Sequence, residues 1–231
     1  MTVWHSHVLP DMDDGSHSVE ESLAMLGALR EQGIDRVVAT PHFYADDETV
    51  EHFLERREQA YQALLPHLTE DLPRLLLGAE VRYYPGIRHL EGLECLRIGE
   101  GELLLLEMPV EPWSDYQVRE LRKLASRYGQ IKLVLAHIDR YFRFLPSGVA
   151  EQLCDDHGIL LQANAGAFER FGDRRRVMQL LRSGRLCFIG SDCHDMQKRP
   201  PQIRPAYQRV EKALGNEAFA GWLARAERMQ K

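Results

Sequence analysis

The sequence has few cysteines and no long apolar run, and these two absences exclude several classes of protein. Four cysteines occur in 231 residues, none of them in a Cys-x-x-Cys pair, so we do not expect a disulfide scaffold. No apolar run approaches the roughly 20 residues that a membrane span needs. The amino terminus also lacks the basic region and apolar stretch of a signal peptide. We therefore expect a cytoplasmic protein with reduced thiols and no membrane insertion.

An excess of basic residues is also missing. The chain has 35 acidic and 29 basic residues, which gives a formal net charge of -6 and a pI near 5.9. A nucleic-acid-binding protein would usually carry a basic patch or stripe, so we expect no nucleic-acid partner. Carboxylates that hold metal ions offer another explanation for the excess acid, because bound metal neutralises them.

The remaining composition is that of a globular protein with an adequate core. Hydrophobic residues make up 44% and charged residues 28%, with a mean hydropathy of -0.37. A length of 231 residues suits one α/β barrel, since such barrels run to roughly 200 to 250 residues as a single unit. No Pro/Gly/Ser-rich linker divides the chain, and we expect one domain over residues 1–231.

Seven short, nearly continuous apolar runs predict strands that are buried on both faces, as in a parallel sheet. They lie at the amino terminus and over residues 34–40, 75–79, 103–106, 133–136, 159–161 and 186–189. Most are separated by apolar residues at helical spacing. These predicted helices stop at or near Gly33, Pro66, Gly129, Gly158 and Gly184, and one or two closing helices follow over about residues 206–230.

A barrel explains this order better than an open doubly wound sheet. Six of the seven predicted strands end in a potential metal ligand, and a barrel places its active site at the carboxyl ends of its strands. An open sheet would gather such residues near one switch point, and would more often show a Gly-rich loop after its first strand. No such loop is visible in the sequence.

Histidine, aspartate and glutamate recur where the predicted strands end. The set comprises His5, His7, Asp14, His42, Glu80, Glu107, His137, Asp192 and His194. Any one of them is more often a cap or a hydrogen-bonding residue than a ligand, but a barrel would bring the whole group together. His5 and His7 would also share one strand face, because side chains alternate along a strand.

The chemistry of these donors points to a cluster of metal ions. Nitrogen and oxygen ligands without an obvious thiolate suit Mn, Fe or Zn. Nine donors are too many for one ion, so two or three ions are implied, with a carboxylate such as Glu80 as a bridge. Clustered ions are typical of phosphoester hydrolysis, since they activate water and neutralise the transferring phosphoryl group.

Two arginines could complete a phosphate site, and one cysteine motif needs a separate explanation. Arg140 and Arg199 follow His137 and His194 closely and could each hold a phosphate bidentately, although a surface role is the alternative.

Cys193 and Arg199 match the Cys-x5-Arg pattern of thiol-dependent tyrosine phosphatases, but the intervening residues contain no glycine. We interpret that match as chance. The remaining histidines are expected to face solvent: His17, His52, His67, His89 and His157.

Several motifs together resemble the polymerase and histidinol phosphatase (PHP) superfamily. They are His-Ser-His-Val-Leu-Pro with Asp-Asp-Gly, Ala-Thr-Pro-His-Phe, Gly-Ala-Glu-Val, Leu-Leu-Glu-Met-Pro, Leu-Ala-His-Ile-Asp-Arg-Tyr and Gly-Ser-Asp-Cys-His. More narrowly, they resemble its bacterial manganese-dependent protein-tyrosine phosphatases of capsule and exopolysaccharide synthesis. The likeness runs from His5 to about Arg199.

The resemblance implies an α/β fold, a distorted (β/α)7 TIM-like barrel, with three divalent ions. Mn²⁺ is expected, with Fe or Zn as alternatives. The first ion would bind His5, His7, Glu80 and Asp192. The second would bind Glu80, Glu107 and His137, and the third would bind Asp14, His42 and His194. Arg140 and Arg199 would match the family's phosphate-binding arginines. The implied substrate is a phosphotyrosine-containing protein tail, such as that of a tyrosine autokinase regulating capsule synthesis. Ile138-Asp139 and Cys193 depart from the usual Pro-Glu and a small residue, which affects the expected loop shape but not the ligands.

Two other functions fit the same ligand set. One is a histidinol-phosphate phosphatase or another small-molecule phosphoesterase, although such relatives tend to be longer, with loops that cover the pocket. The short connections in this chain favour an open site suited to a flexible tail. The other is a non-catalytic regulator that binds metal or phosphate, against which the complete set of donors argues.

Overall fold

The computed structural model describes residues 1–127, 131–146 and 148–230, and the strands in this part of the chain pair in parallel. The strands are β1 (Thr2–Val3), β2 (Arg36–Ala39), β3 (His42–Phe43), β4 (Arg74–Leu77), β5 (Glu80–Arg82), β6 (Leu103–Glu107), β7 (Lys132–Leu135), β8 (Leu160–Asn164) and β9 (Leu186–Gly190). They form sheets of order β1-β2-β4 and β3-β5-β6-β7-β8-β9. Because β3 continues β2 and β5 continues β4, the segments make up seven strand units, as predicted.

Backbone hydrogen bonds close these units into a ring. Trp4 N donates to Ile189 O at 3.1 Å, and Asp192 N donates to the carbonyl of His5 at 2.9 Å, so the first unit meets the last. Pro41, which has no N–H, separates β2 from β3. The predicted parallel α/β barrel is confirmed, and its distortion lies where the second and third units are broken.

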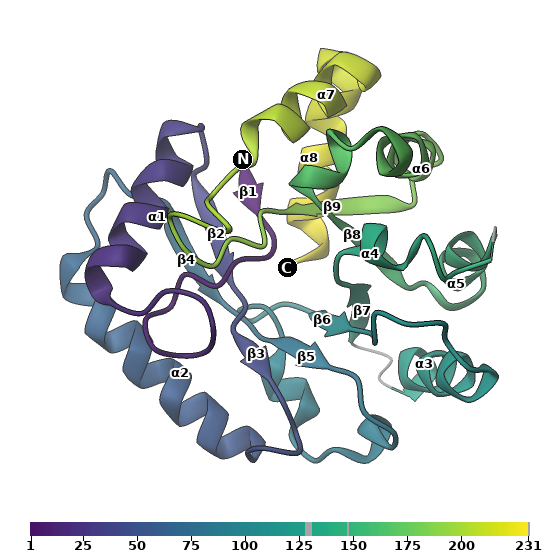
Figure 1. Cartoon of the computed structure of the whole chain (residues 1–231), viewed down its shortest axis with the longest axis horizontal. Coiled ribbons are helices and arrows are strands. Elements are labelled where there is room, and N and C mark those ends of the chain that lie inside the picture. Colours follow the sequence, from purple (N-terminus) through teal and green to yellow (C-terminus); the bar gives the residue numbers. More distant parts are fainter. Residues whose placement is uncertain (128–130, 147, 231) are drawn as a thin grey trace.

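Helices surround the ring of strands (Figure 1). They are α1 (Val19–Glu31), α2 (Val50–Leu64), α3 (Asp115–Arg127), α4 (Ile138–Tyr141), α5 (Val149–His157), α6 (Phe171–Arg182), α7 (Arg204–Leu214) and α8 (Asn216–Met229). Short 3-10 turns occur at Leu65–His67, Ile87–His89, Leu93–Leu96 and Ala165–Phe168. Two closing helices, α7 and α8, thus cover the predicted range of about residues 206–230, and α7 begins two residues before it. The predicted helix end at Gly129 lies outside the described residues.

The predicted start and stop signals act as expected at the ends of two helices. The hydroxyl of Ser18 accepts a hydrogen bond from Glu21 N and caps α1. Gly158 adopts a φ of 63° directly after α5, a conformation that disfavours residues with a Cβ. Local sequence therefore fixes where these connections turn back towards the ring.

The barrel interior is packed at one end and open at the other. Trp4 and Phe188 lie inside with their ring centroids 4.7 Å apart, and Ala226 of α8 packs into the same cluster. The indole N–H of Trp222, also on α8, donates to Leu186 O at 2.9 Å. Since α8 covers the amino-terminal end, the carboxyl ends of the strands remain as the open face. None of the helices in the described ranges has the length and apolar character of a membrane span.

One buried hydrogen bond ties α7 to the first strand. The hydroxyl of Tyr207, which is 2% exposed, donates to Thr2 O in β1, and burial raises the pKa of this phenol. We expect Tyr207→Phe to lower the free energy of unfolding by about 1 kcal/mol, because a buried carbonyl loses its donor. Urea denaturation measures this, with Tyr116→Phe at an exposed position of α3 as the control. Equal stability of both variants would contradict the prediction.

Candidate metal centre

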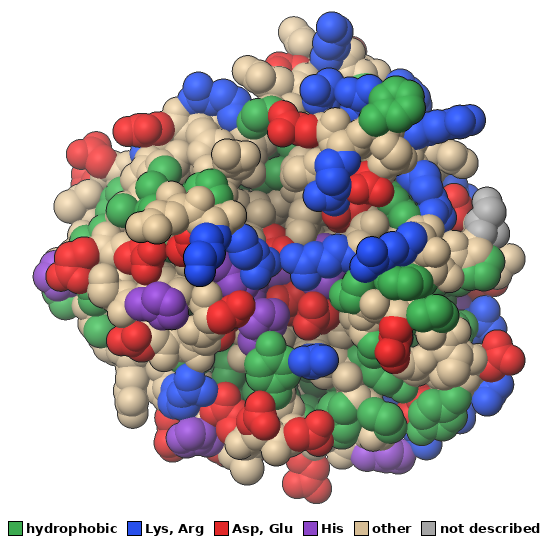
Figure 2. Space-filling model, in the orientation of Figure 1, with side chains coloured by type: hydrophobic (Ala, Val, Ile, Leu, Met, Phe, Trp, Pro, Cys, Tyr) green, Lys and Arg blue, Asp and Glu red, His purple; other side chains and the backbone are tan. Residues whose placement is uncertain are grey.

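The nine predicted ligands meet at the open end of the barrel. They come from the segment after β1 (His5, His7 and Asp14), from β3 (His42), β5 (Glu80) and β6 (Glu107), and from the segments after β7 (His137) and β9 (Asp192 and His194). Figure 2 shows histidine and acidic side chains in the central hollow of this face, below a band of Lys and Arg side chains. The parallel topology brings together residues that are up to 189 positions apart, His5 and His194.

Glu80 lies at the middle of this group and is 1% exposed. Its Oε2 atom is 3.1 Å from His5 Nε2, 3.3 Å from His7 Nε2 and 3.1 Å from His42 Nδ1. Its Oε1 atom is 3.0 Å from His137 Nε2. One carboxylate therefore reaches four imidazoles with both of its oxygens, which is the arrangement of a bridging ligand.

The structure contains three groups of possible metal ligands, and within each group the donor atoms lie within 4.8 Å of one another. They are His7, Asp14, His42 and His194; His5, His7 and Glu80; and His42, Glu80 and Glu107. Compared with the predicted sets, His7 and His42 are each shared between two groups. His137 lies 3.2 Å from Glu107 Oε1, and Asp192 Oδ1 lies 3.6 Å from His5 and 3.5 Å from His7. Every predicted ligand therefore has another predicted ligand as a neighbour.

Two buried histidine ring nitrogens without a hydrogen-bond partner indicate whether these residues fit a metal ion. His42 Nδ1 and His194 Nε2 are buried without a hydrogen-bond partner in the described ranges. An unsatisfied buried polar atom costs about 1–3 kcal/mol. Each of these nitrogens lies near a carboxylate oxygen, 3.1 Å from Glu80 and 3.3 Å from Asp14. Buried imidazole nitrogens without a hydrogen-bond partner, beside carboxylate oxygens, suit a divalent cation with nitrogen and oxygen ligands, so the residues fit the predicted metal.

The protonation states of Glu80 and His194 suit metal binding, whereas His7 and His137 must each lose a proton to bind metal. Burial lowers the pKa of both imidazoles, but Asp13 outweighs it at His7 and raises that pKa well above its ordinary value, and Glu107 and Glu80 outweigh it at His137 and raise that pKa to about 9. Burial disfavours the charged form of Glu80, but the neighbouring imidazoles of His5 and His137 outweigh it and hold the pKa of Glu80 well below its usual value. Burial and the charge of His7 lower the pKa of His194 to about 4. An ionised carboxylate and a neutral imidazole are the forms that bind metal.

Asp13 contacts two of the predicted ligands, and the sequence analysis missed it. Its Oδ2 atom lies 2.6 Å from His7 Nδ1 and accepts a hydrogen bond from His42 N at 2.8 Å. Its Oδ1 atom accepts from Gly15 N at 2.9 Å. A carboxylate on the outer nitrogen of a ligating histidine fixes the ring so that Nε2 faces the metal. The Asp-Asp-Gly motif pointed to this segment in the sequence, but the sequence does not show which of the two aspartates supports His7. The conformation of the turn decides it.

Replacing Asp13 with Asn should weaken metal binding while the fold is retained. Loss of such an outer carboxylate typically costs about 10–100-fold in metal affinity, and we expect a decrease of that size. Isothermal titration of the metal-free protein with Mn²⁺ measures it. Asp11→Asn in the same loop is a suitable control, because the Asp11 side chain lines a cavity away from the imidazoles. Unchanged affinity in Asp13→Asn would show that Asp13 does not orient His7.

The strand unit β8 supplies supporting groups instead of a ligand. Gln162 Oε1 accepts a hydrogen bond from His137 N at 2.6 Å and lies 3.3 Å from His5 Nδ1. Gln162 Nε2 donates to Asn164 Oδ1 at 3.0 Å, and Asn164 Nδ2 donates to Asp192 Oδ2 at 2.8 Å. This network holds three predicted ligands in place. The only sequence signal for Gln162 was its position directly after the predicted apolar run of residues 159–161.

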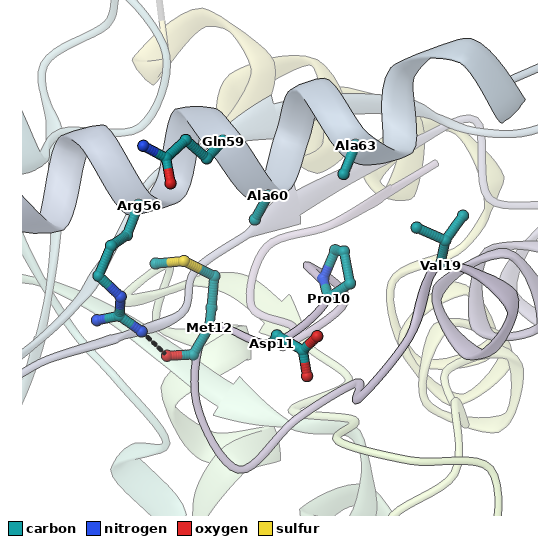
Figure 3. A pocket seen from close by; sticks show the side chains of 8 residues that line it. All are labelled: Pro10, Asp11, Met12, Val19, Arg56, Gln59, Ala60 and Ala63. Carbon is teal, nitrogen blue, oxygen red and sulfur yellow. Dashed lines mark hydrogen bonds between the residues drawn. The ribbon is translucent and has the colours of Figure 1, made fainter.

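The loop that carries Asp14 is anchored on α2. Arg56 Nη2 donates to Met12 O at 2.7 Å, as the dashed line in Figure 3 shows. A cavity of about 290 Å³ lies behind the loop, between Pro10 and the side chains of α2. The Asp14 side chain itself is 68% exposed, so it reaches the centre from the solvent side.

The two predicted arginines border the centre on either side of Asp192. Arg140, on α4, contacts Asp192 Oδ2, and its Nη1 atom lies 3.8 Å from Glu107. Arg199 Nη2 lies 2.8 Å from Asp192 Oδ1, and its Nη1 atom lies 4.0 Å from Asp14. Both side chains are half-buried. They are therefore placed to meet an anion that lies over the centre.

The remaining predicted residues lie as expected. Cys193 is 1% exposed within the core, and burial raises the pKa of its thiol to about 11. A buried, protonated thiol is a poor nucleophile, which supports interpreting the Cys-x5-Arg match as chance. His17, His52, His67 and His89 are exposed and His157 is half-buried.

A family model for capsular polysaccharide synthesis proteins, CpsB/CapC, matches residues 2–227. The chain belongs to the CpsB/CapC family. This finding confirms the resemblance that the motifs carry. Its relatives include the tyrosine-protein phosphatase CpsB of Streptococcus pneumoniae, 28% identical over 91% of this chain and 90% of that protein. Another is the tyrosine-protein phosphatase YwqE of Bacillus subtilis, 27% identical over 92% and 85%.

Solved structures place the fold of this CpsB/CapC chain among known barrels. A chain from the crystal structures of YwqE and CpsB, described as metal-dependent tyrosine phosphatases, matches with a TM-score of 0.80 and 24% identity over 100% of this chain and 96% of that chain. A mutant organophosphorus hydrolase matches with a TM-score of 0.56 and 14% identity, over 100% of this chain and 92% of the hydrolase. At such identities these likenesses concern the fold alone.

Proposed function

We propose that this chain is a metal-dependent protein-tyrosine phosphatase that hydrolyses phosphotyrosine on a protein tail. The observation that carries the proposal is the buried Glu80 carboxylate, which reaches four imidazoles at the open end of the barrel. Arg140 and Arg199 lie beside this centre on either side of Asp192. Curated relatives in the same family are named tyrosine-protein phosphatases. This supports phosphotyrosine as the substrate group.

The proposed metal complement is three divalent ions, with Mn²⁺ expected. The nine residues at the strand ends would hold them, with Glu80 shared between ions. When bound, such ions supply water of lowered pKa and neutralise phosphoryl charge. Within this arrangement, Asp13 keeps the outer nitrogen of His7 occupied, and Gln162 holds the backbone of His137.

Arg140 and Arg199 would bind the phosphoryl oxygens. Each guanidinium can present two parallel N–H donors to a phosphate, which fixes its orientation as well as its charge. Asp192 lies between them and holds both side chains over the centre before substrate arrives. Charge that develops on the phosphoryl group then meets donors that are already in place.

The substrate we propose is the phosphorylated tail of a bacterial tyrosine kinase that regulates capsule or exopolysaccharide synthesis, in the cytoplasm. The family's link to capsular polysaccharide synthesis supports this choice. The centre also lies at an open barrel end, with the Asp14 side chain on its solvent side. A centre at the open end of the barrel suits a flexible tail, which can approach it from the side of Asp14.

Rates on two substrates test the proposal. We expect the Mn²⁺-loaded protein to show kcat/KM on a phosphotyrosine peptide at least about tenfold above that on histidinol phosphate, a ratio within the range that pocket contacts supply. The opposite preference would favour a small-molecule phosphoesterase. Bound metal without turnover of either substrate or of p-nitrophenyl phosphate would favour a non-catalytic regulator.

A further inference from the structure

A polar cavity of about 350 Å³ adjoins the metal centre on the side away from the histidines. The charged residues in its wall are Asp139, Arg140, Arg170, Asp192, Lys198 and Arg199. Four of these six are cations, so the wall has an excess of two positive charges. Arg140, Arg199 and Asp192 also border the centre, which makes the cavity continuous with the proposed phosphate site.

Both carboxylates in the wall are already paired. Asp139 is 4% exposed; its Oδ1 atom accepts from Asn164 N at 2.9 Å and its Oδ2 atom from Arg170 at 2.8 Å. Asp192 contacts both Arg140 and Arg199. Neither carboxylate therefore offers a free negative charge to the cavity.

Lys198 supplies an exposed positive charge at the edge of the cavity. In the described part of the chain, no carboxylate oxygen lies within 4.0 Å of its ammonium group. Asp195 is an acidic neighbour, but its Oδ1 atom accepts hydrogen bonds from the backbone N–H groups of Gln197 at 2.6 Å, of Lys198, and of Arg199 at 3.4 Å. Asp195 thus holds the turn that carries Lys198 and Arg199.

A second cavity extends the positive surface beyond Arg170. It has a volume of about 330 Å³ and shares Asp139, Arg140 and Arg170 with the first, while adding Val110, Arg143 and Asp173. The Asp173 carboxylate is paired with Arg170 at 2.6 Å, so Arg143 is the cation that this cavity adds. Arg143 is exposed, its guanidinium lies 4.7 Å from the centroid of the Phe144 ring, and among the residues with described positions no carboxylate pairs with it. The two cavities share Asp139, Arg140 and Arg170, and we refer to them together as the basic groove.

We propose that this basic groove, bordered by Lys198 at one end and Arg143 at the other, binds a second anionic side chain of the phosphotyrosine substrate. The proposal rests on the proposed function and makes Lys198 and Arg143 specificity-determining residues. Because Arg140 belongs to both the centre and the groove, the second anion would lie within a few residues of the phosphotyrosine, at about 3.3–3.6 Å of extended chain per residue. A carboxylate or a second phosphate would each supply the required charge.

Matched peptides test the groove. One phosphotyrosine sequence is made with Glu, phosphoserine or Gln at the positions flanking the phosphotyrosine, and kcat/KM is measured with the Mn²⁺-loaded full-length protein. We expect the anionic peptides to exceed the Gln peptide by about five- to tenfold, the effect of one or two partly exposed ion pairs. The advantage should shrink as ionic strength rises. The larger gain of the two identifies carboxylate or phosphate as the preferred anion.

Variants connect this preference to the groove. Lys198→Gln and Arg143→Gln should each reduce the ratio of anionic to neutral peptide, and Lys198→Arg should preserve it. Lys123→Gln, at an exposed position of α3, should leave the ratio unchanged. Equal hydrolysis of all three peptides by the wild type would overturn the proposal and leave the proposed function intact. If no phosphotyrosine peptide is hydrolysed, both fail.

Discussion

Glu80→Gln should reduce kcat/KM on a phosphotyrosine peptide by roughly 10³-fold or more, the largest effect that we expect from a single substitution. The side chain keeps its size, but loses the negative charge that faces His5, His7 and His137. Metal-ion catalysis supplies several kcal/mol of transition-state stabilisation, and each 1.36 kcal/mol is a factor of ten in rate. Bound metal, measured by elemental analysis, should fall in the same preparation.

A matched substitution separates this effect from general damage. Glu55→Gln, at an exposed position of α2, should leave both activity and metal content unchanged. Circular dichroism and urea denaturation establish whether Glu80→Gln remains folded. A folded Glu80→Gln protein with wild-type metal content and turnover would remove Glu80 from the role of bridging ligand.

Arg199→Ala should lower kcat/KM by about 10²–10³-fold, the range observed when one preorganised donor to transition-state charge is removed. Unlike Glu80, Arg199 is not a metal ligand in this account, so metal content should be retained. The loss should also be only partly restored by Lys, because an ammonium group lacks the planar fork that binds phosphate bidentately. Kinetics with p-nitrophenyl phosphate measure the effect without any peptide contact.

Arg182→Ala is the control for this substitution, since Arg182 is an exposed residue at the last turn of α6. It should retain full turnover. If Arg199→Ala also retains full turnover with p-nitrophenyl phosphate, then Arg199 does not bind the phosphoryl group, and its contact with Asp192 is merely structural.

The fold and the ligand set followed from a pattern that repeats along the chain. Apolar runs that end in His, Asp or Glu have meaning only if the strand ends converge, and a parallel barrel makes them converge. The pattern thus predicts that His5 and Asp192 lie at the same end of the barrel, and His5 Nε2 lies 3.6 Å from Asp192 Oδ1. The predicted ligand set depended on the topology and not on burial, so it also contained Asp14, whose side chain is exposed.

Supporting residues could not be predicted in the same way. Asp13 and Asp14 are adjacent and chemically identical, and only the turn decides which one faces Nδ1 of His7 and which approaches His194. Gln162 lies in β8, and its side chain accepts a hydrogen bond from the backbone N–H of His137, which follows β7. Such roles arise from three-dimensional contacts that no periodic pattern records. The sharing of His42 between two groups of donors has the same origin.

Chelation followed by metal add-back is the most direct test of the central claim, that metal ions at the strand ends perform the hydrolysis. The protein is treated with EDTA, desalted, and assayed on a phosphotyrosine peptide with and without Mn²⁺, before and after treatment with iodoacetamide. We predict that chelation abolishes turnover, that Mn²⁺ restores it in proportion to the metal bound, and that iodoacetamide has no effect, because Cys193 is buried. Turnover that survives in metal-free protein but is lost on alkylation of Cys193 would contradict the account.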